Sequence, residues 1–341
     1  MYNTFMNALA RDILSYIQSD APDDEIFNEL SLRLFARQFE HNEPYRRLCE
    51  SVGVVPGDIR RWQQVPAAPA QAFKRCELSC VPIDLARAAF HSSGTTGADT
   101  SRHFMDEDGL ALYEASLRRG FDLALPKDRP HEIWALMPSP NASPNSSLSH
   151  MLGALGAARY LWDDNDAAAA ALSARAEPLL LFGTAFAFVG LFDAVAAQWR
   201  LPAGSVVIET GGFKGRTREV SREDLYAMLS SRFHVPLDRC YSEYGMSEMA
   251  SQFYGRGLDP VKRGPFWVRT LLVDPETGGE AAAGAAGLLA HFDLANFNSV
   301  GAIQTEDLGI AAVDGFALLG RATDAELRGC SLTAEELWTR Q

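Results

Sequence analysis

Six consecutive small residues form the segment of this sequence with the clearest chemical potential. They are Ser92, Ser93, Gly94, Thr95, Thr96 and Gly97. Such a loop can bring backbone N–H groups and hydroxyls close to phosphate oxygens, because no bulky side chain keeps the anion away. No Gly-Lys-Ser/Thr follows, so the loop is not a Walker A motif. The sequence predicts a phosphate-binding loop here, with a polar surface turn as the alternative.

A second candidate segment, residues 241–248, places an aromatic ring, a glycine, a hydroxyl and a carboxylate within five positions. Tyr244 could stack on a base beside Gly245, and Ser247 could bond a phosphate. Glu248 could hold Mg²⁺, which prefers hard oxygen ligands. The alternative is a strand end that carries a solvated acid.

A third candidate pair consists of Asp307 and Arg321. Asp307, predicted at the end of a strand, could accept hydrogen bonds from a ribose diol, and Arg321 could offer charged donors to the same nucleotide. Taken singly, each residue is more typical of a surface charge.

The elements that must position these segments alternate between strands and helices. The first 50 residues show a helical period and end at a break around Pro44. Strands are predicted at residues 131–137, 179–182 and 205–209, and helices at 109–119 and 223–229. This alternation favours an α/β fold with a largely parallel sheet.

After Pro265 the pattern changes to antiparallel strands separated by turns such as Asp314-Gly315. These strands are predicted at residues 271–273, 287–291, 301–304 and 316–319. We therefore predict four parts: a helical and wrapping segment (1–82), an α/β core (83–264), an antiparallel β subdomain (265–321) and a short tail (322–341).

The composition of the 341 residues is that of a globular protein, with 47% hydrophobic and 22% charged residues. A net charge of −13 argues against nucleic acid as a partner. The longest apolar stretches fall short of a membrane span, and the N-terminus lacks the pattern of a signal peptide. Five cysteines, an odd number, suit free thiols in a reducing compartment, so we expect a cytoplasmic protein.

The three candidate segments, in this order, resemble the adenylate-forming superfamily of acyl-CoA ligases, luciferase-type enzymes and peptide-synthetase adenylation domains. Within it, the sequence looks most like the acyl-protein synthetase (LuxE) family. That narrower resemblance covers nearly the whole chain and rests on residues 42–45, 65–66, 72–74, 145–148, 209–215, 291–296, 305–309 and 328–331.

The resemblance implies a role for each segment. The Ser/Thr/Gly loop would embrace pyrophosphate, with Thr95 and Thr96 acting on the leaving group, and residues 244–248 would hold adenine and magnesium. Asp307 and Arg321 would bind the ribose. Gly211 and Gly212 would border the adenine, because glycine permits close backbone approach. Among three histidines that we weighed, His91, His103 and His291, the weaker candidates for the acyl pocket or for a base are His91 and His291. Each is at least as typical of a packed, hydrogen-bonded histidine.

Two features depart from the superfamily. Many members carry a lysine just after the phosphate loop, a position that lacks one here. Arg102 could substitute for it, or the loop could work through backbone donors alone. Larger relatives continue into a mobile C-terminal domain with a catalytic lysine, whereas this sequence has no lysine after Lys262. We therefore expect the mobile domain to be absent, with Lys214 or Arg321 as candidate replacements for its lysine.

The resemblance also implies an acyl acceptor, because acyl-protein synthetases are acylated on a cysteine near the C-terminus. Cys330 matches that cysteine in position and local sequence, and a thiolate is an effective nucleophile toward a mixed anhydride. The predicted enzyme uses ATP and Mg²⁺ to activate a fatty or aryl acid and transfers the acyl group to Cys330. A reductase or a carrier protein would be the partner. The alternatives are a small acyl- or aryl-CoA ligase and a non-catalytic nucleotide-binding subunit.

Overall fold

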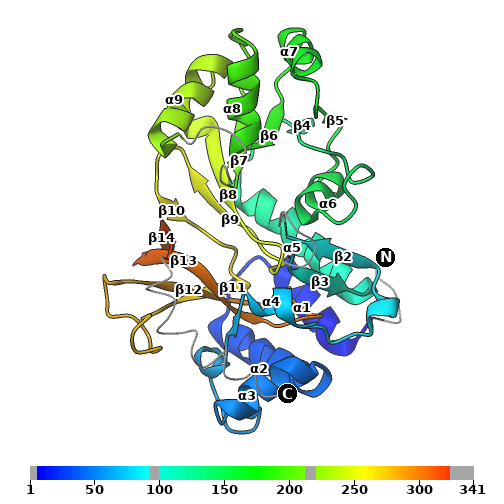
Figure 1. Ribbon diagram of the computed structural model, residues 1–341, viewed down its shortest axis with the longest axis vertical. Helices are drawn as coiled ribbons and strands as arrows, with labels where there is room; N and C mark the ends of the chain where they lie inside the picture. Colours follow the sequence, from blue (N-terminus) through cyan, green and yellow to red (C-terminus); the bar gives the residue numbers. More distant parts are fainter. Residues whose placement is uncertain (1–5, 93–99, 212–219, 323–341) are drawn as a thin grey trace. The chain divides into compact units, whose positions relative to one another are not determined.

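The computed structural model describes residues 6–92, 100–211 and 220–322 (Figure 1). The chain divides into two compact units, each built from segments that are not contiguous in sequence. Unit 1 comprises residues 1–119, 246–251 and 264–341, and unit 2 comprises residues 120–245 and 252–263. No helix within the described residues is long and apolar enough to cross a membrane.

Unit 1 begins with the helices that the periodicity predicts. They are α1 (Ala8–Gln18), α2 (Asp24–His41) and α3 (Glu43–Ser51). The side chains of Asn7, Asp23 and Asn42 each accept a backbone N–H bond and so cap the three N-termini. Helix α2 buries Phe27 and Leu34 on one face, which anchors it to the core of the unit.

An antiparallel sheet follows in unit 1, as the strand pattern after Pro265 predicts. It contains β11 (Val268–Val273), β12 (Ala286–Asp293), β13 (Ala302–Ala312) and β14 (Gly315–Arg321), each paired with the next. The short strand β1 (Ala68–Pro69) pairs in parallel with β13.

The connection between the helices and this sheet carries short elements. They are η1 (Trp62–Gln64), α4 (Ala72–Arg75) and η2 (Ile83–Leu85). A two-stranded antiparallel hairpin of β2 (Ala88–His91) and β3 (Arg102–Met105) comes next, and helix α5 (Glu107–Ala124) leads out of unit 1. The candidate phosphate loop therefore connects β2 to β3.

Unit 2 contains the predicted parallel sheet, in the strand order β5-β4-β6-β7-β8-β9. Its parallel strands are β4 (Ile133–Leu136), β5 (Arg159–Tyr160), β6 (Leu180–Thr184), β7 (Val206–Thr210) and β8 (Cys240–Tyr244). Strand β9 (Phe253–Arg256) joins β8 in antiparallel fashion, and β10 (Val261–Lys262) follows it.

The helices of unit 2 are α6 (Ser147–Ala154), α7 (Asn165–Ser173), α8 (Ala185–Ala194) and α9 (Arg222–Phe233), with the turn η3 (Leu237–Arg239) before β8. Helices α7, α8 and α9 share one apolar core with the sheet, which includes Leu181, Phe188, Val207 and Phe233 (Figure 1). The prediction of an α/β fold with a parallel sheet and an antiparallel β subdomain is confirmed.

Candidate active site

The base of the candidate phosphate loop is closed by hydrogen bonds between Ser92 and Ser101. The N–H of Ser92 donates to the Ser101 carbonyl over 3.1 Å, and the N–H of Ser101 donates to Ser92 Oγ over 3.0 Å. His91 lies opposite Arg102 in the hairpin register. Ser93, Gly94, Thr95, Thr96 and Gly97 lie outside the described residues, so the structure describes only the two ends of this loop. Those ends form a hairpin neck.

Two side chains of unit 1 bind the backbone carbonyls of Ser247 and Glu248. His103 Nδ1 from β3 donates to the Ser247 carbonyl over 2.9 Å, and Asn296 Nδ2 donates to the Glu248 carbonyl over 2.8 Å. Ser247 Oγ lies 3.5 Å from the His91 carbonyl at the neck of the phosphate loop. Two motifs that are about 150 positions apart in the chain therefore meet in unit 1.

Asp293, at the end of β12, binds the residues that directly follow this segment. Its Oδ2 accepts from the Ala250 N–H over 3.0 Å, and its Oδ1 accepts from Ser251 Oγ over 2.7 Å and from the Ala295 N–H over 3.0 Å. The side chain is fully buried, and burial raises the pKa of Asp293 to about 6. Sequence reasoning missed this role, although a carboxylate at the end of a mostly apolar strand was a visible signal.

The structure places the three weighed histidines differently. Burial lowers the pKa of His103 to about 4 and that of His291 to about 3, so both rings are neutral near pH 7. His291 lies within β12, where its Nδ1 and Thr270 Oγ1 are 2.9 Å apart and its ring packs on Phe316. His91 is partly buried at the loop neck. A packed His291 with a pKa of about 3 is a poor general base near pH 7.

Asp307 and Arg321 are brought together as neighbours on β13 and β14. The distance from Arg321 Nε to Asp307 Oδ1 is 3.5 Å, and Arg321 Nη2 lies 2.8 Å from Glu306 Oε2. The expectation that Asp307 ends a strand is wrong, because β13 continues to Ala312 after a shift in register between Leu308 and Gly309. Arg321 is 71% exposed, so its guanidinium is open to a ligand.

In unit 2, Gly211 and Tyr244 lie at the carboxyl ends of neighbouring parallel strands, since Thr210 pairs with Glu243. Ligands of open α/β sheets bind at this edge. Gly211 has a φ of +68°, a conformation that favours glycine. At Gly245, a Cβ would lie 2.6 Å from Glu243 Oε1, so a larger residue would displace that carboxylate. Gly212 lies outside the described residues.

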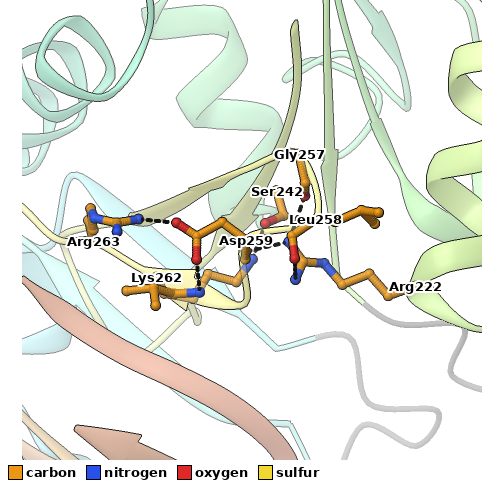
Figure 2. Close-up of polar contacts among 8 residues, drawn as sticks. Arg222, Ser242, Gly257, Leu258, Asp259, Lys262 and Arg263 are labelled. Atoms are coloured by element: carbon orange, nitrogen blue, oxygen red, sulfur yellow. Dashed lines mark hydrogen bonds and ion pairs between the residues drawn. The ribbon is translucent and has the colours of Figure 1, made fainter. Parts of the chain in front are cut away.

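A cluster of buried polar side chains, which sequence reasoning missed, lies near the carboxyl ends of β7 and β8. Glu209 and Glu243 are 8% and 7% exposed, and burial raises the pKa of each to about 7. Thr210 Oγ1 donates to Glu243 Oε2, and Tyr226 OH donates to Glu209 Oε1 over 3.3 Å. Lys262 Nζ donates to Ser242 Oγ, and burial lowers the pKa of Lys262 to about 8 (Figure 2).

The described part of the chain contains no group of three or more His, Cys, Asp or Glu residues arranged to hold a metal ion. Protein sites for Mg²⁺ commonly use one or two carboxylates and leave the remaining positions to phosphates and water. A single buried carboxylate such as Glu248 is compatible with that donor set. Arg102, weighed as a substitute for the missing lysine, pairs with Glu77 at 3.3 Å. Lys214 and Cys330 lie outside the described residues.

The fold of the two units is that of the adenylate-forming ligases. A 2-hydroxyisobutyryl-CoA ligase, solved in an open conformation with 2-HIB-AMP and CoA, superposes with a TM-score of 0.66 at 13% identity, covering 90% of this chain and 75% of that one. The ATP-bound MatB from Rhodopseudomonas palustris gives a TM-score of 0.52 at 16% identity, covering 71% of this chain and 49% of that one. No curated protein matches the sequence significantly.

The family is defined by the sequence. The family model of the acyl-protein synthetases, LuxE, matches residues 165–339, which are 175 of the 341 residues. The chain belongs to the LuxE family of acyl-protein synthetases.

Proposed function

We propose that this protein activates a fatty or aryl acid with ATP and Mg²⁺ and then carries the acyl group as a thioester on Cys330. In the first step, a carboxylate oxygen attacks the α-phosphorus, the bond from that phosphorus to the bridging oxygen breaks, and pyrophosphate leaves. In the second step, the Cys330 thiolate attacks the acyl carbon, the bond to the AMP oxygen breaks, and AMP leaves. Membership of the LuxE family supports both steps.

One observation carries the first step: Ser247 Oγ lies 3.5 Å from the His91 carbonyl, beside the neck of the phosphate loop. This contact brings the segment assigned to phosphate and magnesium to the loop assigned to pyrophosphate. The hydrogen bonds from His103 and Asn296 hold the backbone of Ser247 and Glu248, so both side chains project from a fixed backbone. Ser247 would bond a phosphate oxygen, and Glu248 would ligate Mg²⁺.

The other cysteines support Cys330 as the acceptor. Burial raises the pKa of Cys49 and Cys240 to about 12 and that of Cys80 to about 11, and it also raises the pKa of Cys76. A thiol with a raised pKa supplies almost no thiolate near neutral pH. These four residues are therefore poor acyl acceptors.

The acyl thioester would be delivered to a partner, which we propose to be an acyl reductase or an acyl carrier protein. A second candidate function is a small CoA ligase, which the fold shared with 2-hydroxyisobutyryl-CoA ligase favours. In that case coenzyme A would replace Cys330 as the nucleophile.

Incubation with radioactive acid, ATP and Mg²⁺ separates the two functions. The acyl-protein synthetase function predicts label on the C-terminal peptide that holds Cys330, released by neutral hydroxylamine. The ligase function predicts acyl-CoA and no labelled protein. AMP release that depends on coenzyme A would contradict our proposal, and AMP release without it would support it.

A further inference from the structure

Lys262 is an unusual residue in this protein, because it is one of only four lysines and is 6% exposed. A buried ammonium is unfavourable unless charged or polar groups surround it. Here Nζ donates to Ser242 Oγ, two positions before Tyr244 on β8. The carboxylates of Glu209 and Glu243 both favour the charged form of Lys262.

The two carboxylates occupy the edge of the sheet where unit 2 would receive a nucleotide. Glu209 on β7 lies two positions before Gly211, and Glu243 on β8 directly precedes Tyr244. Two uncompensated carboxylates on neighbouring strands would repel each other. The ammonium of Lys262 offsets this repulsion, because it bonds to Ser242, which pairs with Glu209 across β7 and β8.

The turn that precedes Lys262, residues 257–259, is held by Arg222 at the start of α9. Its Nη2 donates to the carbonyls of Gly257 over 2.8 Å and Asp259 over 2.7 Å, and its Nη1 donates to the Leu258 carbonyl over 3.3 Å (Figure 2). Asp259 then accepts from the Val261 N–H over 3.0 Å and pairs with Arg263 at 2.8 Å. Three consecutive carbonyls held by one guanidinium make this turn a built support for the lysine.

We propose that Lys262 is a positioning residue for nucleotide binding, which neutralises Glu209 and Glu243 and ties the end of β8 through Ser242. It acts through the strand ends, keeping Gly211 and Tyr244 in place, and does not touch the nucleotide. This inference rests on the proposed adenylation reaction. It adds an electrostatic support to the site that the sequence motifs do not contain.

The support has a pH range set by the groups around it. Lys262 interacts electrostatically with Glu209 on β7, Glu243 on β8 and Arg222 on α9. Tyr226 on α9 donates to Glu209, and Asp259 and Arg263 belong to the turn of Lys262 itself. Burial lowers the pKa of Lys262 to about 8, so the lysine loses its charge as the pH rises beyond that value. The KM for ATP should therefore rise above pH 8.

The test compares Lys262→Met with the double variant Lys262→Met/Glu209→Gln and with the control Lys127→Met, whose lysine is exposed on the same unit. Pyrophosphate exchange is measured from about pH 6.5 to 9, with separate values for kcat, KM of ATP and KM of the acid. We expect Lys262→Met to raise the KM of ATP about tenfold at pH 8, equivalent to about 1.4 kcal/mol. The kcat and the KM of the acid should change less than about threefold.

Removal of one carboxylate in the double variant should restore the KM of ATP to within about threefold, and Lys127→Met should match the wild type. A Lys262→Met protein with a wild-type KM at pH 8, or a double variant without rescue, would overturn the inference. If Lys262→Met does not fold, the folded double variant is compared with Glu209→Gln alone, and a KM of ATP more than about threefold higher in the double variant would overturn the inference. If the wild type exchanges no pyrophosphate, the proposed function fails. The dissociation constant of ATP, measured by calorimetry, then tests the inference by the same pattern.

Discussion

The hydrogen bond from Asn296 to the Glu248 carbonyl offers a direct test of how the magnesium ligand is held. The Asn296→Ala substitution removes this 2.8 Å bond from a fully buried site. Loss of one partner of a buried hydrogen bond costs about 1–3 kcal/mol, because the remaining group is left without solvent or a partner. Domains are typically stable by about 5–15 kcal/mol, so the variant should remain folded.

The effect on activity should exceed the effect on folding. The contacts from His103 to Ser247 and from Asp293 to Ala250 remain, so the main loss falls on the backbone of Glu248. If the energy of the lost hydrogen bond is lost from the binding of Mg²⁺ by Glu248, pyrophosphate exchange at limiting Mg²⁺ should fall roughly five- to hundredfold.

Asn28→Ala provides a matched control in the same unit. Asn28 Nδ2 donates to the Arg60 carbonyl over 2.9 Å, a bond of similar length on an exposed surface. Urea unfolding followed by tryptophan fluorescence should show a smaller loss of stability for Asn28→Ala than for Asn296→Ala, and exchange should be unchanged in this control. Equal exchange rates in the two variants would refute the reasoning that Asn296 positions Glu248.

Three further predictions follow from the site. Glu248→Ala should abolish pyrophosphate exchange in a folded protein by removing the magnesium ligand, and a wild-type rate would remove this assignment. Cys330→Ser should keep exchange near the wild-type rate but lose covalent acyl label, because a serine hydroxyl is hardly ionised at neutral pH; a labelled variant would place the acceptor elsewhere. His103 has a folded pKa of about 4, below its ordinary value of 6.5, so its contribution to stability is present above pH 6.5 and is lost as pH falls toward 4. The stability difference between wild type and His103→Gln should therefore shrink by up to about 3 kcal/mol between these pH values in urea unfolding, and a constant difference would contradict this.

Much of the fold could be predicted because local periodicity decides it. The buried strand β6 (Leu180–Thr184) and the hairpin through Asp314-Gly315 follow from short apolar runs and a turn signal. The prediction that Asp307 ends a strand was wrong because β13 contains polar residues of the kind that usually mark the end of a strand. A register shift between Leu308 and Gly309 lets the strand continue, and no local pattern indicates such a shift.

The supports of the candidate site escaped prediction for a different reason. Asp293 and Lys262 act through partners that lie 20 to 43 positions away in the sequence. Their importance depends on burial, because a buried charged group must bind polar or charged partners and so holds them in place. The motif residues Ser247 and Glu248 could be found from residue type and spacing, whereas the groups that hold them required the tertiary structure.

Acid-dependent exchange of labelled pyrophosphate into ATP tests the central claim most directly. The purified protein is incubated with ATP, Mg²⁺ and labelled pyrophosphate, alone and with each member of a panel of fatty and aromatic acids. We predict exchange that requires both Mg²⁺ and an acid, proceeds without coenzyme A, and is lost in Glu248→Ala. Binding of ATP with no exchange for any acid would contradict the claim that this protein forms acyl-adenylates.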